Sequence, residues 1–250
     1  MKKILILTVV CVISLSLAAC TVRAPQNSTS EVSSEKIVPS DEREILNTDI
    51  AEADVKIGND TNIASSTNEN ALILYFTRSN NLDREPDIDA ISRASINVVK
   101  DGIYGNTEII ARFIQDSVDG DLLPLEVSSP YPYLVDDTIE GINNNGDSRI
   151  VTTQIENLDQ YGIIYIGYPI WYATLPEPIS RFIEAQDFSG KIIVPFSTHR
   201  GSRMGSSIRD LGTLLPNSTI VEGFTISGES AIESEVEVEE WLKKIGMISP

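Results

Sequence analysis

The sequence predicts an α/β protein, in which a parallel sheet of five strands carries helices on both faces. Short, nearly continuous apolar runs are typical of strands buried on both faces, and they alternate along this chain with segments of helical periodicity. The alternation begins at residue 71 and fills the remaining length, which suits one domain. Because crossovers between parallel strands are right-handed, this order favours a doubly wound sheet.

The predicted elements follow one another regularly. Residues 71–76 form an apolar run that stops at polar residues, which indicates a first strand, and residues 107–118 place their apolar side chains on one side of a helix. Further strands are expected at 122–127, 162–168, 191–196 and 219–226, and further helices at 177–185, 205–215 and 233–245. Pro195 is expected at the exit of its strand, because proline cannot donate to a strand ladder.

The first 70 residues have a different character. Lys2 and Lys3 precede an apolar run that ends at residue 17, and small residues follow at 18–19, which is the layout of a secretory signal. Residues 21–70 contain no aromatic side chain and are mostly polar, so they are expected to form a flexible tether. We therefore divide the chain into a signal peptide at 1–19, a tether at 20–70 and a folded domain at 71–250.

Cys20 directly follows the small residues of the signal. This arrangement resembles the lipobox of bacterial lipoproteins, and the resemblance implies that Cys20 carries lipid and tethers the protein to the bacterial cell membrane outside the cytoplasm. The alternative is an ordinary signal peptide with a chance cysteine. Cys11 lies within the signal, so on the lipobox interpretation the mature chain has no thiol for a disulfide, for catalysis or for a metal.

Composition excludes further classes of function. The formal net charge of −18 repels phosphate backbones, so no nucleic-acid partner is expected. The charge suits either a basic partner or plain solubility. Because His199 is the only histidine, a zinc site made of several histidines is implausible, and no metal is expected.

Ligands of such sheets bind beyond the carboxyl ends of the strands, so the loops after the strands matter most. Residues 77–81 follow the first strand and residues 105–107 open the next helix; together they offer hydroxyls, amides, a guanidinium and a helix N-terminus, which suit a phosphate. The alternative is a polar turn with an ordinary helix cap at Asn106 or Thr107.

Two later loops complete the predicted site. Trp171 and Tyr172 follow the third strand, where they would either pack against another element or stack on a flat ligand. Residues 197–207 follow the fourth strand, and their glycines allow a ligand to approach the backbone closely. His199 lies in this loop as either a proton donor or a neutral hydrogen-bonding partner.

Five strings in this order resemble the flavodoxin-like family, in the branch whose phosphate loop is split by an insertion. They are residues 72–79 (LILYFTRS), 105–111 (GNTEIIA), 167–171 (GYPIW), 188–191 (FSGK) and 195–202 (PFSTHRGS). The resemblance implies the strand order 2-1-3-4-5 and bound FMN.

The resemblance also implies a role for each matching residue. The FMN phosphate would be held by Thr77, Arg78, Ser79, Asn80, Asn106 and Thr107. One side of the isoalloxazine would be flanked by Pro169, Ile170, Trp171, Tyr172 and Ala173, and the other side by Thr198, His199, Gly201, Ser202 and Gly205. The chain departs from the family pattern at Asn80 and Asn81, where a glycine is expected, and in residues 82–104, which either fold over the phosphate or shape a partner surface.

The expected function is electron transfer through FMN to a redox partner protein or a small acceptor. Within that chemistry an NAD(P)H-dependent flavin or quinone reductase is an alternative, although no G-x-G-x-x-G follows a strand. A hydrolase that pairs His199 with a serine lacks the G-x-S-x-G elbow. A non-catalytic lipoprotein domain that has lost its flavin is the third alternative.

Overall fold

The computed structural model describes residues 70–83, 96–99, 102–132 and 135–250. All of them belong to one compact unit, Ile50–Pro250. The predicted signal peptide, the lipid site at Cys20 and the tether up to residue 69 lie outside the described residues. Within the described ranges, no helix has the length and apolar character needed to cross a membrane.

A parallel sheet forms the centre of this unit. Its strands are β1 (Asn70–Tyr75), β4 (Asp121–Pro124), β5 (Tyr161–Pro169), β6 (Ile192–His199), β7 (Thr219–Ile220) and β8 (Phe224–Ser227). Their order is β4-β1-β5-β6-β7, and β8 also pairs with β6. Every pairing in the sheet is parallel. The predicted order 2-1-3-4-5 is confirmed.

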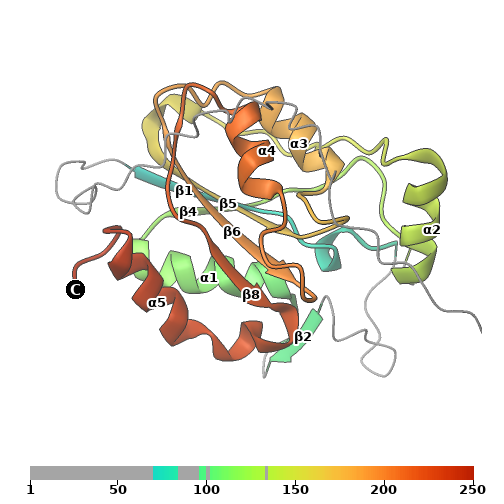
Figure 1. Ribbon diagram of the computed structural model, residues 1–250, viewed down its shortest axis with the longest axis horizontal. Coiled ribbons are helices and arrows are strands. Elements are labelled where there is room, and N and C mark those ends of the chain that lie inside the picture. The colour runs from blue at the N-terminus through green and yellow to red at the C-terminus, as the bar shows by residue number, and fades with distance from the viewer. Residues whose placement is uncertain (1–69, 84–95, 100–101, 133–134) are drawn as a thin grey trace, which may run out of the picture. The chain divides into compact units, whose positions relative to one another are not determined.

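Helices cover both faces of the sheet, as predicted. Figure 1 shows α1 (Asn106–Val118) and α5 (Glu235–Lys244) on one side, and α3 (Glu177–Glu184) and α4 (Ser207–Leu214) on the other. Alternate side chains of β1 enter the two resulting cores: Leu72 and Leu74 face the α3 and α4 side, whereas Ile73 faces the α1 and α5 side. The central strand β1 is therefore buried on both faces.

Two expectations about the last strands were wrong. Pro195 is not at the exit of its strand, because β6 continues to His199. The expected fifth strand is divided, with β7 pairing at Ile193 and β8 at Phe196. The Ile193 carbonyl accepts the amide of Val221 on this edge, and Pro195, two residues on, presents the same edge without a donor. The proline therefore lies where the ladder is already interrupted.

Several elements had no counterpart in the sequence prediction. Helix α2 (Val135–Asn145) lies at one end of the sheet, beyond α3 in Figure 1. Within the insertion, β2 (Ile96–Val99) and β3 (Gly102–Gly105) form an antiparallel hairpin. Short 3-10 turns add η1 (Ser79–Asn81), η3 (Leu158–Gln160) and η4 (Gly228–Glu233). Because β3 ends directly at α1, the hairpin carries the chain back to the start of that helix.

Candidate functional site

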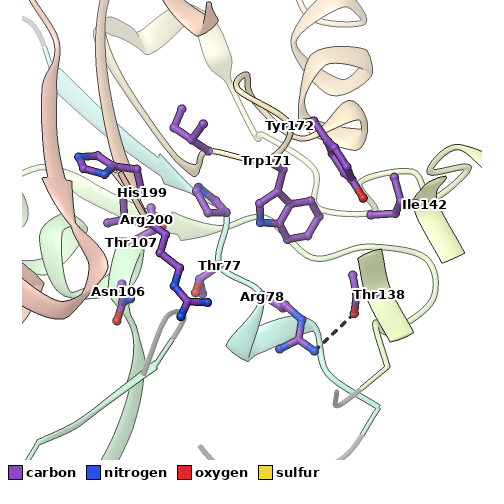
Figure 2. A pocket seen from close by; sticks show the side chains of 13 residues that line it. Thr77, Arg78, Asn106, Thr107, Thr138, Ile142, Trp171, Tyr172, His199 and Arg200 are labelled. Atoms are coloured by element: carbon purple, nitrogen blue, oxygen red, sulfur yellow. Dashed lines mark hydrogen bonds between the residues drawn. The ribbon is translucent and has the colours of Figure 1, made fainter. Parts of the chain in front are cut away.

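A pocket of about 260 Å³ opens at the carboxyl ends of β1, β5 and β6. Figure 2 shows the side chains around it. They come from the last residues of β5 and β6, from the loops after these three strands, from the first turn of α1 and from α2. The lining residues are Thr77, Arg78, Asn106, Thr107, Thr138, Ile142, Pro169, Ile170, Trp171, Tyr172, Thr198, His199 and Arg200.

The polar end of the pocket is built around Gly105, the residue that precedes α1. A Cβ added at Gly105 would lie 1.8 Å from the Thr77 hydroxyl oxygen and 2.4 Å from that of Ser79. The two hydroxyls are 3.2 Å apart. Gly105 caps the helix without a side-chain hydrogen bond, so the interpretation of Asn106 or Thr107 as an ordinary cap was wrong. The start of α1 thus brings its amides beside two hydroxyls, an arrangement that suits an anion.

Arg78 is 5% exposed and reaches away from this end of the pocket. Its guanidinium donates to the Pro132 carbonyl and lies 3.4 Å from the Thr138 hydroxyl of α2. The dashed line in Figure 2 marks the second contact. Arg78 therefore attaches α2 to the loop after β1, and this explains how α2 comes to line the pocket.

Asn81, which stands near the expected glycine position, has a structural role. Its side-chain amide donates to the carbonyls of Thr77 at 2.9 Å and Leu125 at 3.1 Å, and its side-chain oxygen accepts the Val127 amide at 2.8 Å. A glycine could make none of these bonds. The buried asparagine therefore joins the loop after β1 to the segment after β4.

Trp171 and Tyr172 form the aromatic wall of the pocket. Trp171 packs edge-on against Phe76 and Tyr131, with ring centroids 5.7 Å and 5.2 Å apart. Tyr172 is 55% exposed and has a φ of 49°, and Ala173 follows with a φ of 64°. Residues other than glycine rarely adopt this region of backbone dihedral angles. Backbone strain of this kind is concentrated at functional sites. Packing thus fixes Trp171, while Tyr172 remains at the rim.

Tyr131 is itself held by a polar cluster. Its hydroxyl donates to the buried Asp147 carboxylate at 2.6 Å, and the Arg149 guanidinium lies 3.9 Å from the centre of its ring. Burial and the bond to Asp147 raise the pKa of Tyr131 above its usual range. The phenol is therefore neutral, and the cluster supports Trp171 from behind.

The loop after β6 forms the other wall. The Gly201 amide donates to Nδ1 of His199 at 2.8 Å, and burial together with the charge of Arg203 lowers the pKa of His199. Both effects favour a neutral imidazole that carries its proton on Nε2. In Figure 2 this ring points away from the middle of the pocket. The hydroxyls of Thr107 and Thr198 lie 2.9 Å apart and join α1 to β6.

The loops after β5 and β6 are bonded to each other. The Ser206 amide donates to the Ala173 carbonyl at 2.7 Å, and the Asp210 carboxylate accepts the hydroxyls of Thr174 at 2.6 Å and Ser206 at 2.8 Å. A Cβ at Gly205 would lie 2.0 Å from the same Ala173 oxygen. Burial raises the pKa of Asp210, but these bonds outweigh it and leave the pKa below its usual value.

Comparison with known proteins identifies the family. The model of the flavodoxin family matches residues 103–245, which is more than half of the chain. The chain belongs to the flavodoxin family. No curated protein matches it in sequence.

Two solved structures resemble this chain along nearly their whole length. A candidate flavoprotein from Bacteroides eggerthii DSM 20697 is 26% identical, with a TM-score of 0.52, and the match covers 71% of this chain and 98% of that one. A second, from Bacteroides uniformis ATCC 8492, is 22% identical with a TM-score of 0.51, and the match covers 71% and 99%. The second likeness supports the fold alone.

Ten of the predicted cofactor residues line the pocket. The other six do not line it; they are Ser79, Asn80, Ala173, Gly201, Ser202 and Gly205. Three lining residues were not predicted: Thr138, Ile142 and Arg200. The first two share one face of α2 at a spacing of four residues, a signal that the sequence does contain. Across the described ranges, no group of three or more His, Cys, Asp or Glu side chains could hold a metal ion.

Proposed function

We propose that this protein binds FMN in the pocket and transfers electrons to a redox partner protein or a small acceptor. One observation carries the proposal: the same pocket has a polar end at the start of α1 that suits an anion, and an aromatic wall at Trp171 and Tyr172. FMN has the same two parts, a phosphate and a flat ring system. The bound flavin would supply the redox chemistry, while the protein supplies binding, orientation and electrostatics.

The residues at the polar end suit a phosphate. Because Gly105 has no Cβ, the hydroxyls of Thr77 and Ser79 can lie directly against the backbone at the start of the 13-residue helix α1. The helix dipole and the amides that lack partners within the helix favour a negative charge there. Asn106 and Thr107 line the pocket at this point. We assign this end to the phosphate.

The residues at the aromatic wall suit a planar ring. Trp171 is fixed on two sides by Phe76 and Tyr131, so it loses little side-chain freedom when a ring stacks on it. Tyr172 can cover the ring from the rim. Burial and the charge of Arg203 lower the pKa of His199, so the neutral imidazole adds no charge to the wall. The wall would exclude water and orient the ring.

The test is a measurement of flavin content. The full-length protein is purified in detergent, incubated with FMN, separated from free flavin and examined by visible absorbance. We expect a flavin spectrum and a stoichiometry near one per chain. A folded protein that retains no flavin absorption would refute FMN binding and would favour a domain that has lost its cofactor.

Steady-state oxidation of NADH or NADPH separates a carrier from a reductase. We expect an electron carrier to show no sustained turnover with either nucleotide. The hydrolase alternative gains no support from the site, because no serine hydroxyl or carboxylate in the described part of the chain hydrogen-bonds to His199, whose Nδ1 accepts the Gly201 amide.

We also propose that lipid on Cys20 anchors the protein to the outside of the bacterial cell membrane. The layout of the first 20 residues supports this location. Cell fractionation of the wild type and of Cys20→Ser, together with incorporation of a labelled fatty acid, tests it. The wild type is expected in the membrane fraction with the label. A wild type without label would contradict the proposal.

A further inference from the structure

The charge of the pocket differs from that of the whole chain. The sequence has 37 acidic and 19 basic residues. The pocket lining nevertheless contains two arginines, Arg78 and Arg200, and no aspartate or glutamate. A site with only positive charges in so acidic a chain indicates a negatively charged ligand.

The two arginines are placed differently. Arg78 is buried and its guanidinium holds the Pro132 carbonyl and α2. Arg200 is exposed, and no carboxylate among the described residues pairs with it. Arg200 can therefore change its rotamer to meet a ligand, whereas Arg78 cannot do so without releasing α2.

The direction of Arg200 decides which part of a ligand it meets. Arg200 comes from the loop after β6, on the ring side of the predicted site. Figure 2 shows its side chain extending from that loop toward the end of the pocket formed by Thr77 and Asn106. This is the end where the hydroxyls and the N-terminus of α1 favour an anion.

We infer that Arg200 is a binding residue for the cofactor phosphate and makes the site select a phosphorylated flavin over the same flavin without its phosphate. The inference rests on the proposed function. A guanidinium donates two parallel hydrogen bonds to a phosphate, so it adds geometric selectivity to the attraction of its charge. The loop after β6 would then hold both ends of the cofactor, the ring through its backbone and the phosphate through Arg200.

The test compares two ligands and four proteins. The full-length wild type, Arg200→Gln, Arg200→Lys and Arg203→Gln are each titrated with FMN and with riboflavin, and the quenching of flavin fluorescence gives the dissociation constants. Arg203 is the matched control, because it is an exposed arginine of the same loop that does not line the pocket. Its substitution removes the same formal charge.

For Arg200→Gln we expect at least a tenfold weaker affinity for FMN and less than a twofold change for riboflavin. Arg200→Lys should fall between the wild type and Arg200→Gln, because lysine keeps the charge but not the planar fork. Arg203→Gln should match the wild type with both ligands. Added salt should reduce the FMN preference of the wild type more than that of Arg200→Gln.

Different results would contradict the role of Arg200 and the binding of FMN. Equal losses for FMN and riboflavin in Arg200→Gln, or no loss for either, would overturn the role of Arg200 and leave FMN binding intact. An equal loss in Arg203→Gln would show a general charge effect and would also overturn it. A wild type that binds neither flavin would refute the proposed function together with this inference.

Discussion

Gly105→Ala tests the predicted phosphate end most directly. The added methyl carbon would lie 1.8 Å from the Thr77 hydroxyl, 2.4 Å from the Ser79 hydroxyl and 2.7 Å from the Thr77 Cβ. A new rotamer could move the two hydroxyls but not the Thr77 Cβ, which is fixed to the backbone at the end of β1. The loop itself would have to shift, and Thr77 is 3% exposed with buried neighbours.

The size of the effect follows from this crowding. Overpacking of a well-packed region costs about 1–3 kcal/mol of the free energy of unfolding. For a domain of this size each kcal/mol shifts the Tm by roughly 2–4 °C, so we expect a loss of about 2–12 °C. Because the shift separates the hydroxyls from the start of α1, FMN affinity should fall at least tenfold.

Urea denaturation and FMN titration measure the two effects. Gly141→Ala is the matched control, since a Cβ at Gly141 meets nothing within 4 Å. In the exposed interior of α2 the same substitution should raise the free energy of unfolding by up to about 1 kcal/mol, because alanine is the better helix former. If Gly105→Ala kept both the stability and the FMN affinity of the wild type, the crowded phosphate end described above would be wrong.

Three further predictions concern the walls of the pocket. Trp171→Ala should weaken FMN binding by about 1–3 kcal/mol in a fluorescence titration, and an unchanged dissociation constant would exclude Trp171 as the stacking platform. Tyr131→Phe removes the 2.6 Å bond to the buried Asp147 and should cost about 1–3 kcal/mol in urea denaturation; a stability equal to that of the wild type would show that this bond contributes nothing. Burial and Arg203 lower the pKa of His199 in the folded protein. As the pH falls, His199 is therefore protonated in the unfolded chain before it is protonated in the folded one. The free energy of unfolding of the wild type should therefore decrease as the pH falls below about 6.5 by more than that of His199→Asn, and parallel pH profiles would contradict this.

The sequence predicted the central strands well because their burial leaves a strong local signal. Residues 71–76 and 162–168 are apolar runs bounded by polar residues, and the structure places strands there with shifts of one residue at most. The doubly wound arrangement followed from the handedness of the crossovers, and the order of the strands followed from the family resemblance. Both are general properties of the fold, so they did not depend on individual contacts.

The parts that were missed depend on contacts between distant residues. Pro195 looks like the end of a strand locally, but the interruption between β7 and β8 lets β6 continue past it. Helix α2 is attached through Arg78, whose partners lie more than 50 residues away in the sequence. Asn81 replaces the expected glycine because it bonds to the segment after β4. The local sequence could not predict these bonds.

The site residues also divide into those with a local sequence signal and those whose placement depends on the fold. The three loops were found because polar and aromatic residues follow apolar strands, a pattern visible in the sequence. The different orientations of His199 and its neighbour Arg200 come from the backbone of one short loop, and only the structure shows that the guanidinium extends toward the polar end. The roles of individual residues toward a cofactor stay predictions.

The hydrogen bonds between Ala173, Ser206 and Asp210 couple the loop after β5 to the loop after β6, which form the two rims of the pocket. A displacement of either rim must stretch the same 2.7 Å link, so strain introduced on one side is transmitted across the opening without passing through the sheet. The amide proton of Ser206 is shielded only while both rims are in register. The rate of deuterium exchange at the Ser206 amide would therefore report whether the two loops stay bonded. Measured at this one amide, the rate could follow cofactor entry and release.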